Sequence, residues 1–220
     1  MRTKFFLLFL GLTLLSVSAS VAQAHFGLRA APTIGFFGGD FTESAGHGEW
    51  GVELRLNADV RLFGNLEAVA AIAILNQRGA RTVMPAGSDS LWGYKLQYMS
   101  IPIALRYMFR LSDEEAHWAI APTAGVYFGL NGTCKIKQEQ YHGYKTDCSD
   151  RFPGGDGEGT DIGIPVGVEA IYTFVGGSRW EFFARMDVGL KNVLKGAEDL
   201  GLTAVHRTLV VGFGFSYPLY

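Results

Sequence analysis

The segment from Trp50 to Leu62 alternates without interruption between apolar side chains and polar or small ones. The apolar series is Trp50, Val52, Leu54, Leu56, Ala58, Val60 and Leu62, and the opposing series is Gly51, Glu53, Arg55, Asn57, Asp59 and Arg61. Successive side chains of a β-strand point to opposite faces, so this period of two predicts a strand with one apolar face. The segment is longer than a typical strand of about five or six residues and suits a tilted strand that crosses a bilayer.

The same period recurs along the chain and predicts eight strands in all. We place them at 27–37, 50–62, 66–78, 99–109, 118–128, 161–169, 182–191 and 209–217. In the third, Glu67 and Gln77 share a face with Val69 and Leu75, so the period does not assign its faces. Four prolines fall inside predicted strands, where proline removes a ladder hydrogen bond, and they indicate bulges or displaced strand ends. They are Pro32, Pro102, Pro122 and Pro165.

The connections between these strands alternate between short and long. They run over 38–49, 64–65, 80–93, 110–116, 131–158, 173–179 and 192–205. Outer-membrane barrels have this asymmetry, with short periplasmic turns and long external loops. We therefore predict an all-β fold, an eight-stranded antiparallel up-and-down transmembrane β-barrel.

A soluble periplasmic ligand-binding barrel is the alternative, because it shows the same period with its apolar face turned inward. Aromatic residues near the predicted strand ends, such as Tyr107 and Trp118, favour a membrane barrel. Glycines among the charges of the polar face also favour it, since they leave room for long side chains in a narrow lumen.

The N-terminus carries the features of a signal peptide. Arg2 and Lys4 precede an apolar run, and Ala22-Gln23-Ala24 has the small-x-small pattern of a cleavage site. We assign residues 1–24 to the signal peptide and 25–220 to an outer-membrane β-barrel domain, located in the cell outer membrane after export. Loss of Arg2 and Lys4 changes the net charge from −2 to −4. An acidic chain without a basic stripe is not expected to bind nucleic acid.

Four short motifs, in this order and spacing, resemble the PorT-like outer-membrane β-barrel family over essentially the whole mature chain. They are Gln77-Arg78-Gly79, Tyr98-Met99-Ser100-Ile101-Pro102, Asp161-Ile162-Gly163 and Gly189-Leu190-Lys191-Asn192. The resemblance implies a barrel assembled in the outer membrane, without a defined activity for most members. The chain departs from the family in Ser100, where a Glu is common, and in the long loop after Leu130. The ending Gly212-x-x-Phe215-x-Tyr217, followed by Tyr220, looks like the final strand that the barrel-assembly machinery recognises.

The polar faces of the predicted strands carry equal numbers of cations and anions. These charges are Glu53, Arg55, Asp59, Arg61, Arg106, Asp161, Glu169, Arg185, Asp187 and Lys191. Charges inside a narrow barrel must be paired or hydrated, because burial of an unpaired charge costs several kcal/mol. The balance favours a lumen closed by salt bridges, whereas a narrow porin-like channel would more naturally show an excess of one sign.

Cys134 and Cys148 both fall in the longest connection, and an exported chain meets an oxidising compartment, so we predict a disulfide between them. No metal or cofactor is expected. The segment 156–161 is rich in Gly and acidic residues but lacks the closing glutamate of a calcium loop.

An enzyme is not expected, although His47, His142 and His206 are predicted to lie in external loops near serines and aspartates. The sequence contains no nucleophile elbow, paired-carboxylate motif or metal-ligand spacing. We expect a structural or interaction role in the cell envelope. The expected partners are outer-membrane lipid, the barrel-assembly machinery during biogenesis and an unknown envelope or surface protein.

Overall fold

The structure, a computed structural model, describes residues 24–39, 48–83, 91–138, 145–147, 160–192 and 204–219, nearly all of them in strands. The long strands are β1 (Ala24–Gly39), β2 (Gly48–Phe63), β3 (Leu66–Val83), β4 (Leu91–Tyr107), β6 (His117–Gln138), β8 (Thr160–Thr173), β9 (Arg179–Asn192) and β10 (Ala204–Leu219). Two short strands, β5 (Phe109–Arg110) and β7 (Lys145–Asp147), pair with β6. In this part of the chain no helix is long and apolar enough to cross a membrane.

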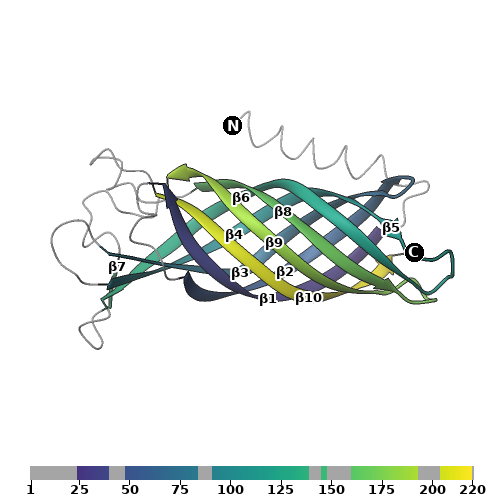
Figure 1. Cartoon of the computed structure of the whole chain (residues 1–220), viewed down its shortest axis with the longest axis horizontal. Helices are drawn as coiled ribbons and strands as arrows, with labels where there is room; N and C mark the ends of the chain where they lie inside the picture. The colour runs from purple at the N-terminus through teal and green to yellow at the C-terminus, as the bar shows by residue number, and fades with distance from the viewer. Residues whose placement is uncertain are drawn as a thin grey trace.

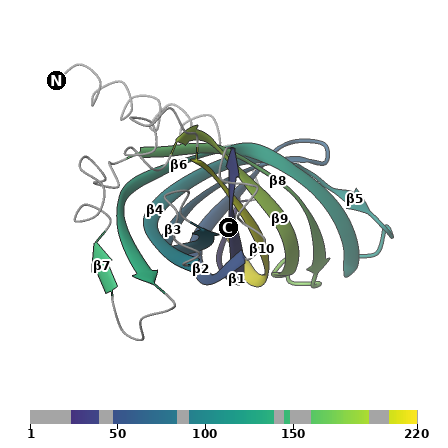
Figure 2. The same ribbon diagram turned by 60° about the vertical axis from the view of Figure 1, so that its left-hand side comes forward.

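The eight long strands form a closed ring. Each pairs antiparallel with the next long strand along the chain, the β4–β6 pairing continues the ring, and β1 pairs with β10 to close it. Figures 1 and 2 show the strands wrapping obliquely around one axis. Closure gives every long strand two neighbours and so removes the unpaired sheet edges that promote aggregation. The predicted fold, an eight-stranded antiparallel up-and-down barrel, is confirmed.

The outer surface of the barrel is apolar. On β4 the side chains of Met99, Ile103, Leu105 and Tyr107 are between 44% and 52% exposed, whereas Arg106 is fully buried. Every other long strand exposes apolar side chains in the same way, among them Phe26, Val52, Ile74, Phe128, Val166, Phe182 and Phe213. The apolar part of β4 is about 20 Å tall when its tilt is included, close to the lipid-facing band of membrane barrels. This arrangement is the reverse of a soluble ligand-binding barrel.

A bulge in β3 explains why the period of two does not assign the faces of that strand. Leu54 pairs with Leu75 while the next residue, Arg55, pairs with Ala73, so Ile74 has no partner in β2. One extra residue reverses the alternation. The inward side chains are Glu67, Val69, Ala71 and Ala73 before the bulge, and Asn76 and Arg78 after it.

The strands continue through all four prolines, so the expectation of bulges or displaced strand ends at these positions is wrong. Each proline keeps the register of its strand pair. The pairs are Pro32 with Val52, Pro102 with Tyr127, Pro122 with Val168 and Pro165 with Asp187. Register shifts occur elsewhere, as in β3, and each proline costs the ladder only the one hydrogen bond for which it lacks a donor.

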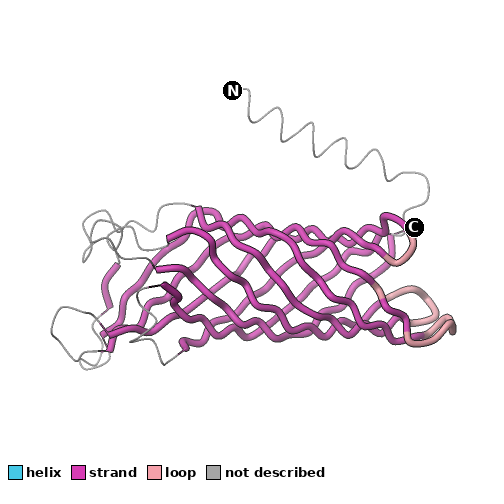
Figure 3. The backbone as a smooth tube through the Cα atoms, turned by 45° about the horizontal axis from the view of Figure 1, so that its top comes forward, coloured by secondary structure: helices cyan, strands magenta, loops and turns pink. Residues whose placement is uncertain are grey.

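The described turns gather at one end of the barrel, as Figure 3 shows. Gly64-Asn65 joins β2 to β3, and residues 174–178 join β8 to β9. Gly64 (φ 54°) and Gly177 (φ 79°) adopt left-handed backbone conformations that favour glycine. We call this the short-turn end; the opposite end, where β3 ends at Val83 and β4 begins at Leu91, is the long-loop end.

Aromatic side chains form a contiguous band outside the barrel near the short-turn end. The ring centroids of Trp118 and Tyr172 lie 5.1 Å apart, those of Tyr172 and Phe174 4.9 Å apart, and those of Phe174 and Trp180 6.3 Å apart. Phe182 lies 6.5 Å from Trp118. Bands of this kind sit at the level of the lipid headgroups in membrane barrels.

The apolar exterior makes a testable prediction at Val166, which lies in the middle of β8 and is 51% exposed. Val166→Arg should lower the free energy of unfolding by about 2–4 kcal/mol, because a cation at the centre of the bilayer loses its hydration. Val166→Leu is the matched control and should have little effect. Unfolding in urea with the protein in lipid vesicles measures both, and equal stabilities of the two variants would contradict a lipid-facing position.

Candidate functional site

The interior of the barrel is polar, charged and shielded from solvent. Six arginines lie there, each at most 8% exposed: Arg29, Arg55, Arg78, Arg106, Arg179 and Arg185. Seven carboxylates accompany them, each at most 5% exposed: Glu53, Asp59, Glu67, Asp161, Glu169, Glu181 and Asp187. All occupy inward positions of the strand alternation, so the sequence pattern that makes the outside apolar also places the charges inside.

Arg106 is the centre of the ion pairs nearer the short-turn end. Its guanidinium lies 2.8 Å from Asp59, 2.6 Å from Glu67 and 2.8 Å from Glu169, and 3.8 Å from Glu181. These four acids come from β2, β3, β8 and β9, while Arg106 itself comes from β4. One side chain thus connects five of the eight long strands across the lumen.

Two further arginines complete this group, which we call the Arg106 layer. Arg29 makes two hydrogen bonds of 2.9 Å to the carboxylate of Glu169 and one of 2.7 Å to Glu181. Arg179 binds both oxygens of Glu67, at 2.9 and 3.1 Å. Forked arginine–carboxylate pairs of this kind combine strong hydrogen bonds with a fixed geometry.

A second group, the Arg78 layer, lies nearer the long-loop end. Arg185 bridges Glu53, at 2.7 Å, and Asp187, at 2.5 Å. Arg55 lies 2.8 Å from the other oxygen of Glu53, and Arg78 lies 3.0 Å from Asp187. The three arginines of this layer therefore share acids with one another, as those of the Arg106 layer do.

The Arg78 layer extends into neutral polar groups. Asp161 lies 3.8 Å from Arg78 and accepts a hydrogen bond of 3.0 Å from the Tyr127 hydroxyl. The Arg78 guanidinium lies 4.7 Å from the centre of the Tyr127 ring and donates to the Asn76 side chain at 3.0 Å. Asn76 in turn donates to the Ser100 hydroxyl at 2.8 Å. Neutral donors and acceptors thus satisfy part of the hydrogen-bonding capacity that the ion pairs leave, while Arg78 Nη1 and Asp161 Oδ1 are buried without a hydrogen-bond partner among the described residues.

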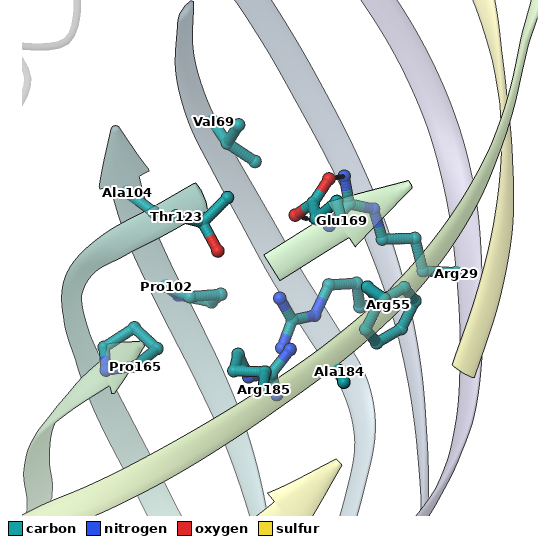
Figure 4. Close-up of a pocket in the computed structure, with 11 residues that line it drawn as sticks. Arg29, Arg55, Val69, Pro102, Ala104, Thr123, Pro165, Glu169, Ala184 and Arg185 are labelled. Carbon is teal, nitrogen blue, oxygen red and sulfur yellow. Dashed lines mark hydrogen bonds and ion pairs between the residues drawn. The ribbon is translucent and has the colours of Figure 1, made fainter. Parts of the chain in front are cut away.

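A small cavity remains between the two layers (Figure 4). Arg55 and Arg185 reach into it from one side, and Arg29 lies against Glu169 on another. Its volume of about 20 Å³ holds about one water molecule. The Arg55 Nε atom is buried there without a hydrogen-bond partner among the described residues.

Eight of the ten charges assigned to the lumen from sequence lie in these two layers. The other two do not. Arg61 is only partly buried, near the short-turn end, where its Nε donates to the Gly64 carbonyl at 2.9 Å. Lys191 is exposed near the end of β9. Both side chains occupy polar-face positions of the alternation. They lie near the strand ends, beyond the part of the barrel where the lumen is closed.

Sequence reasoning missed five charges of the network. Glu67 and Arg78 lie on either side of the β3 bulge, which hides their shared inward direction. Arg179 and Glu181 precede the predicted start of their strand, although the alternation that begins at Phe182 continues back through them. Arg29 lies in a predicted strand without assigned faces, and the alternation of Gly27, Arg29 and Ala31 with their neighbours could have identified it.

Several residues named from the sequence lie outside the described part of the chain. His47, His142, Cys148 and the side chain of Cys134 are among them, so the disulfide stays a prediction. His206 does not lie in an external loop, and that expectation is wrong. It faces the lumen from β10, fully buried, with Nδ1 3.0 Å from the Thr208 hydroxyl.

The lumen opens into a polar cavity of about 480 Å³ at the short-turn end. The residues 113–115 and Arg110 line its rim, and the Glu67–Arg179 pair lies at its inner side. Nearby, the imidazole of His25 lies within hydrogen-bond distance of the Gly177 carbonyl, at 3.0 Å. Over the residues that the structure describes, no group of three or more His, Cys, Asp or Glu side chains is placed to hold a metal ion.

Comparison with solved structures finds the same barrel in outer-membrane proteins. Neisserial surface protein A (NspA) matches with a TM-score of 0.51 and 14% identity, over 90% of this chain and 98% of that chain. A major outer membrane protein from Thermus thermophilus has a TM-score of 0.48 and 13% identity, over 89% of this chain and 99% of that one. The attachment invasion locus protein Ail of Yersinia pestis has a TM-score of 0.42 and 10% identity, with the same coverages.

No protein-family model and no curated protein matches the chain. At this level of identity the similarity to NspA shows a shared fold and carries no specific function. The chain therefore has the fold of the small outer-membrane barrels.

The central position of Arg106 makes it the most informative residue to change. Arg106→Met should lower the free energy of unfolding by about 3–5 kcal/mol, because it removes the cation and leaves buried carboxylates uncompensated. Lys95→Met is the control, since this side chain is 50% exposed and its change should cost less than about 1 kcal/mol. Urea unfolding in vesicles compares the variants. A cost for Arg106→Met no larger than that of the control would show that the network does not stabilise the barrel.

The predicted disulfide can be tested directly. Lys135 and Asp147 are Cα partners in the β6–β7 pairing, and in the sequence Cys134 precedes Lys135 while Cys148 follows Asp147. Mass spectrometry of peptides from the non-reduced protein should find Cys134 linked to Cys148. Closure of this loop should add about 3 kcal/mol of stability, which Cys148→Ser would remove. Recovery of both cysteines as free thiols from freshly prepared membranes would refute the link.

Proposed function

We propose that the protein is an outer-membrane barrel with a closed lumen, which serves as a structural or interaction protein of the cell envelope. The observation that carries this proposal is the combination of an apolar exterior with a lumen filled by two ion-pair layers. The exterior suits lipid, and the fold is shared with outer-membrane proteins such as NspA. The cavity between the layers has a volume of about 20 Å³, too little to enclose a ligand.

A packed lumen argues against conduction. A permeating ion would have to displace guanidinium–carboxylate pairs that meet at 2.7 to 3.1 Å across the barrel. Separation of a buried pair costs several kcal/mol, because each charge loses its partner in a medium of low dielectric constant. The alternative, a narrow channel, is favoured by one observation, the polar cavity of about 480 Å³ at the short-turn end. We interpret that cavity as a vestibule that is closed at its inner end by the Arg106 layer.

The proposed orientation places the short-turn end in the periplasm and the long-loop end outside the cell. Support comes from the lengths of the connections, since outer-membrane barrels keep their long loops external. An envelope or surface protein would then meet the long-loop end. The apolar side chains of Phe215 and Tyr217, 46% and 59% exposed on β10, are consistent with recognition of the last strand by the barrel-assembly machinery. Cleavage after Ala24 belongs to the same proposal.

Membership of the PorT-like family is a finer part of the proposal. Its support is that residues from two separate motifs meet in the Arg78 layer. Arg78, from the first motif, lies 3.8 Å from Asp161, from the third. Short motifs that are distant in the sequence but adjacent in the lumen suit a shared internal polar network.

Two measurements test the proposed function. The protein should be found in the outer-membrane fraction and should migrate faster on a detergent gel when unheated than after boiling, because a closed barrel stays compact in detergent. In planar bilayers the wild type should give no stepwise conductance. Protein that is soluble in the periplasm without a heat shift would refute the membrane location, whereas insertion with steady conductance would favour the channel.

A further inference from the structure

Arginines and lysines occupy different parts of this barrel. All six buried cations of the described lumen are arginines. The lysines in the described part of the chain lie instead towards the long-loop end: Lys95, Lys135, Lys137, Lys145 and Lys191. Arginine suits buried, forked pairing with carboxylates, while the compact and strongly hydrated ammonium of lysine suits a wet surface. The lysines are therefore separate from the internal network along the barrel.

Most of these lysines come together on one extension of the sheet, where β3, β4, β6 and β7 continue beside one another at the long-loop end. Lys95 and Lys135 are Cα partners across β4 and β6, and both are exposed. Two residues further along, Gly93 pairs with Arg81 and Lys137, and Lys137 pairs with Lys145. Paired positions, and positions two apart on one strand, belong to the same face of a sheet. We call these positions, 81, 95, 135, 137 and 145, the basic face.

This face is the continuation of the lipid-facing surface. On β4 the outward positions run from Leu105 and Ile103 to Met99, then to Gln97 and Lys95, with all five side chains exposed. Lys95 lies four residues beyond Met99, about 13 Å along the strand and about 10 Å along the barrel axis after tilt is included. The basic face therefore begins where the apolar surface ends, at the height of a lipid headgroup layer.

Basic residues outnumber acidic ones at the described positions of this face. Five positions of this face are basic in the sequence and two are acidic: Asp147, the Cα partner of Lys135, and Glu49, which lies 4.0 Å from Lys95. Like charges directly opposite each other on a sheet are destabilising, as in the Lys95–Lys135 pair. Glu49 lies 4.0 Å from Lys95, and an anion bound between the two ammonium groups would reduce the repulsion that is left.

We propose that the basic face binds the phosphate groups of anionic lipids in the outer leaflet that surrounds the barrel. The inference rests on the outer-membrane location proposed above. A lipid is favoured over a soluble polyanion because the face is outward, continuous with the lipid-facing surface, and at headgroup height. On β10, Arg207 lies at a similar height. Its side chain is exposed and points outward, two positions beyond Leu209 towards the long-loop end. Basic side chains at this level gain affinity for anionic headgroups from each added charge.

The test uses the full-length protein in nanodiscs of neutral phospholipid doped with a phosphorylated lipid A or with its dephosphorylated form. The ratio of doped to neutral lipid retained around the protein, relative to the bulk mixture, is measured by mass spectrometry. The wild type should enrich the phosphorylated form and not the dephosphorylated one. Lys95→Gln with Lys135→Gln should reduce the enrichment by about fivefold for each lysine removed.

A matched control removes two cations at the other end, Arg61→Gln with Arg110→Gln, and should leave the enrichment unchanged. The heat shift on detergent gels establishes that each variant has inserted and closed. Failure of the wild type to insert would refute the membrane proposal itself. Insertion with enrichment that is unaffected by the Lys95 and Lys135 changes would refute only the basic face as the lipid site.

Two competition experiments separate the sources of phosphate. Inorganic phosphate at millimolar concentration should not displace the lipid, since a free ion lacks the contacts that the acyl chains make with the barrel. Displacement by inorganic phosphate, or binding of heparin in detergent as tight as the lipid binding, would overturn the assignment to a membrane lipid.

Discussion

The structure depends on the need to neutralise every charge that enters a narrow barrel. An eight-stranded lumen is only just wide enough to be filled by side chains, so a carboxylate that points inward meets protein and not bulk water. Here each of the two layers is built from arginines that share their acids. Arg106 touches acids from four other strands, and Arg185 joins Glu53 to Asp187. Pairing across the lumen thus ties together strands that are not neighbours in the sheet.

The inside and outside of the barrel follow from one pattern of alternation, and this is why much of the fold could be predicted from the sequence. The segment Trp50–Leu62 shows both faces in a single stretch, and the structure extends that strand by only a few residues to Gly48–Phe63. Eight lumen charges were identified in the same way. The alternation could not reveal the pairing partners, because which strand faces which across a lumen depends on register and tilt.

The failures of prediction have local causes. In β3 one extra residue at Ile74 reverses the inward positions, so Glu67 and Arg78 appear from the sequence to lie on different faces. The prolines suggest interruptions, yet the barrel accommodates them in register, since the loss of one donor does not break a ladder held on both sides by neighbouring pairs. His206 is expected in a loop only because the predicted last strand begins beyond it, at 209, whereas β10 begins at Ala204. A period of two fixes the face but not the strand ends.

The position of Arg29 affects how firmly the pairing of β1 with β10 holds the barrel closed. This residue lies on β1, and its partners Glu169 and Glu181 lie on β8 and β9, on the other side of the seam where the two ends of the sheet meet. If the seam opened, the two acids would lose a cation at the moment that the backbone ladder was lost. Ion pairs inside the lumen thus hold the seam closed in addition to the backbone hydrogen bonds. Strand-by-strand separation from either chain end should therefore be slower than in a barrel closed by backbone hydrogen bonds alone.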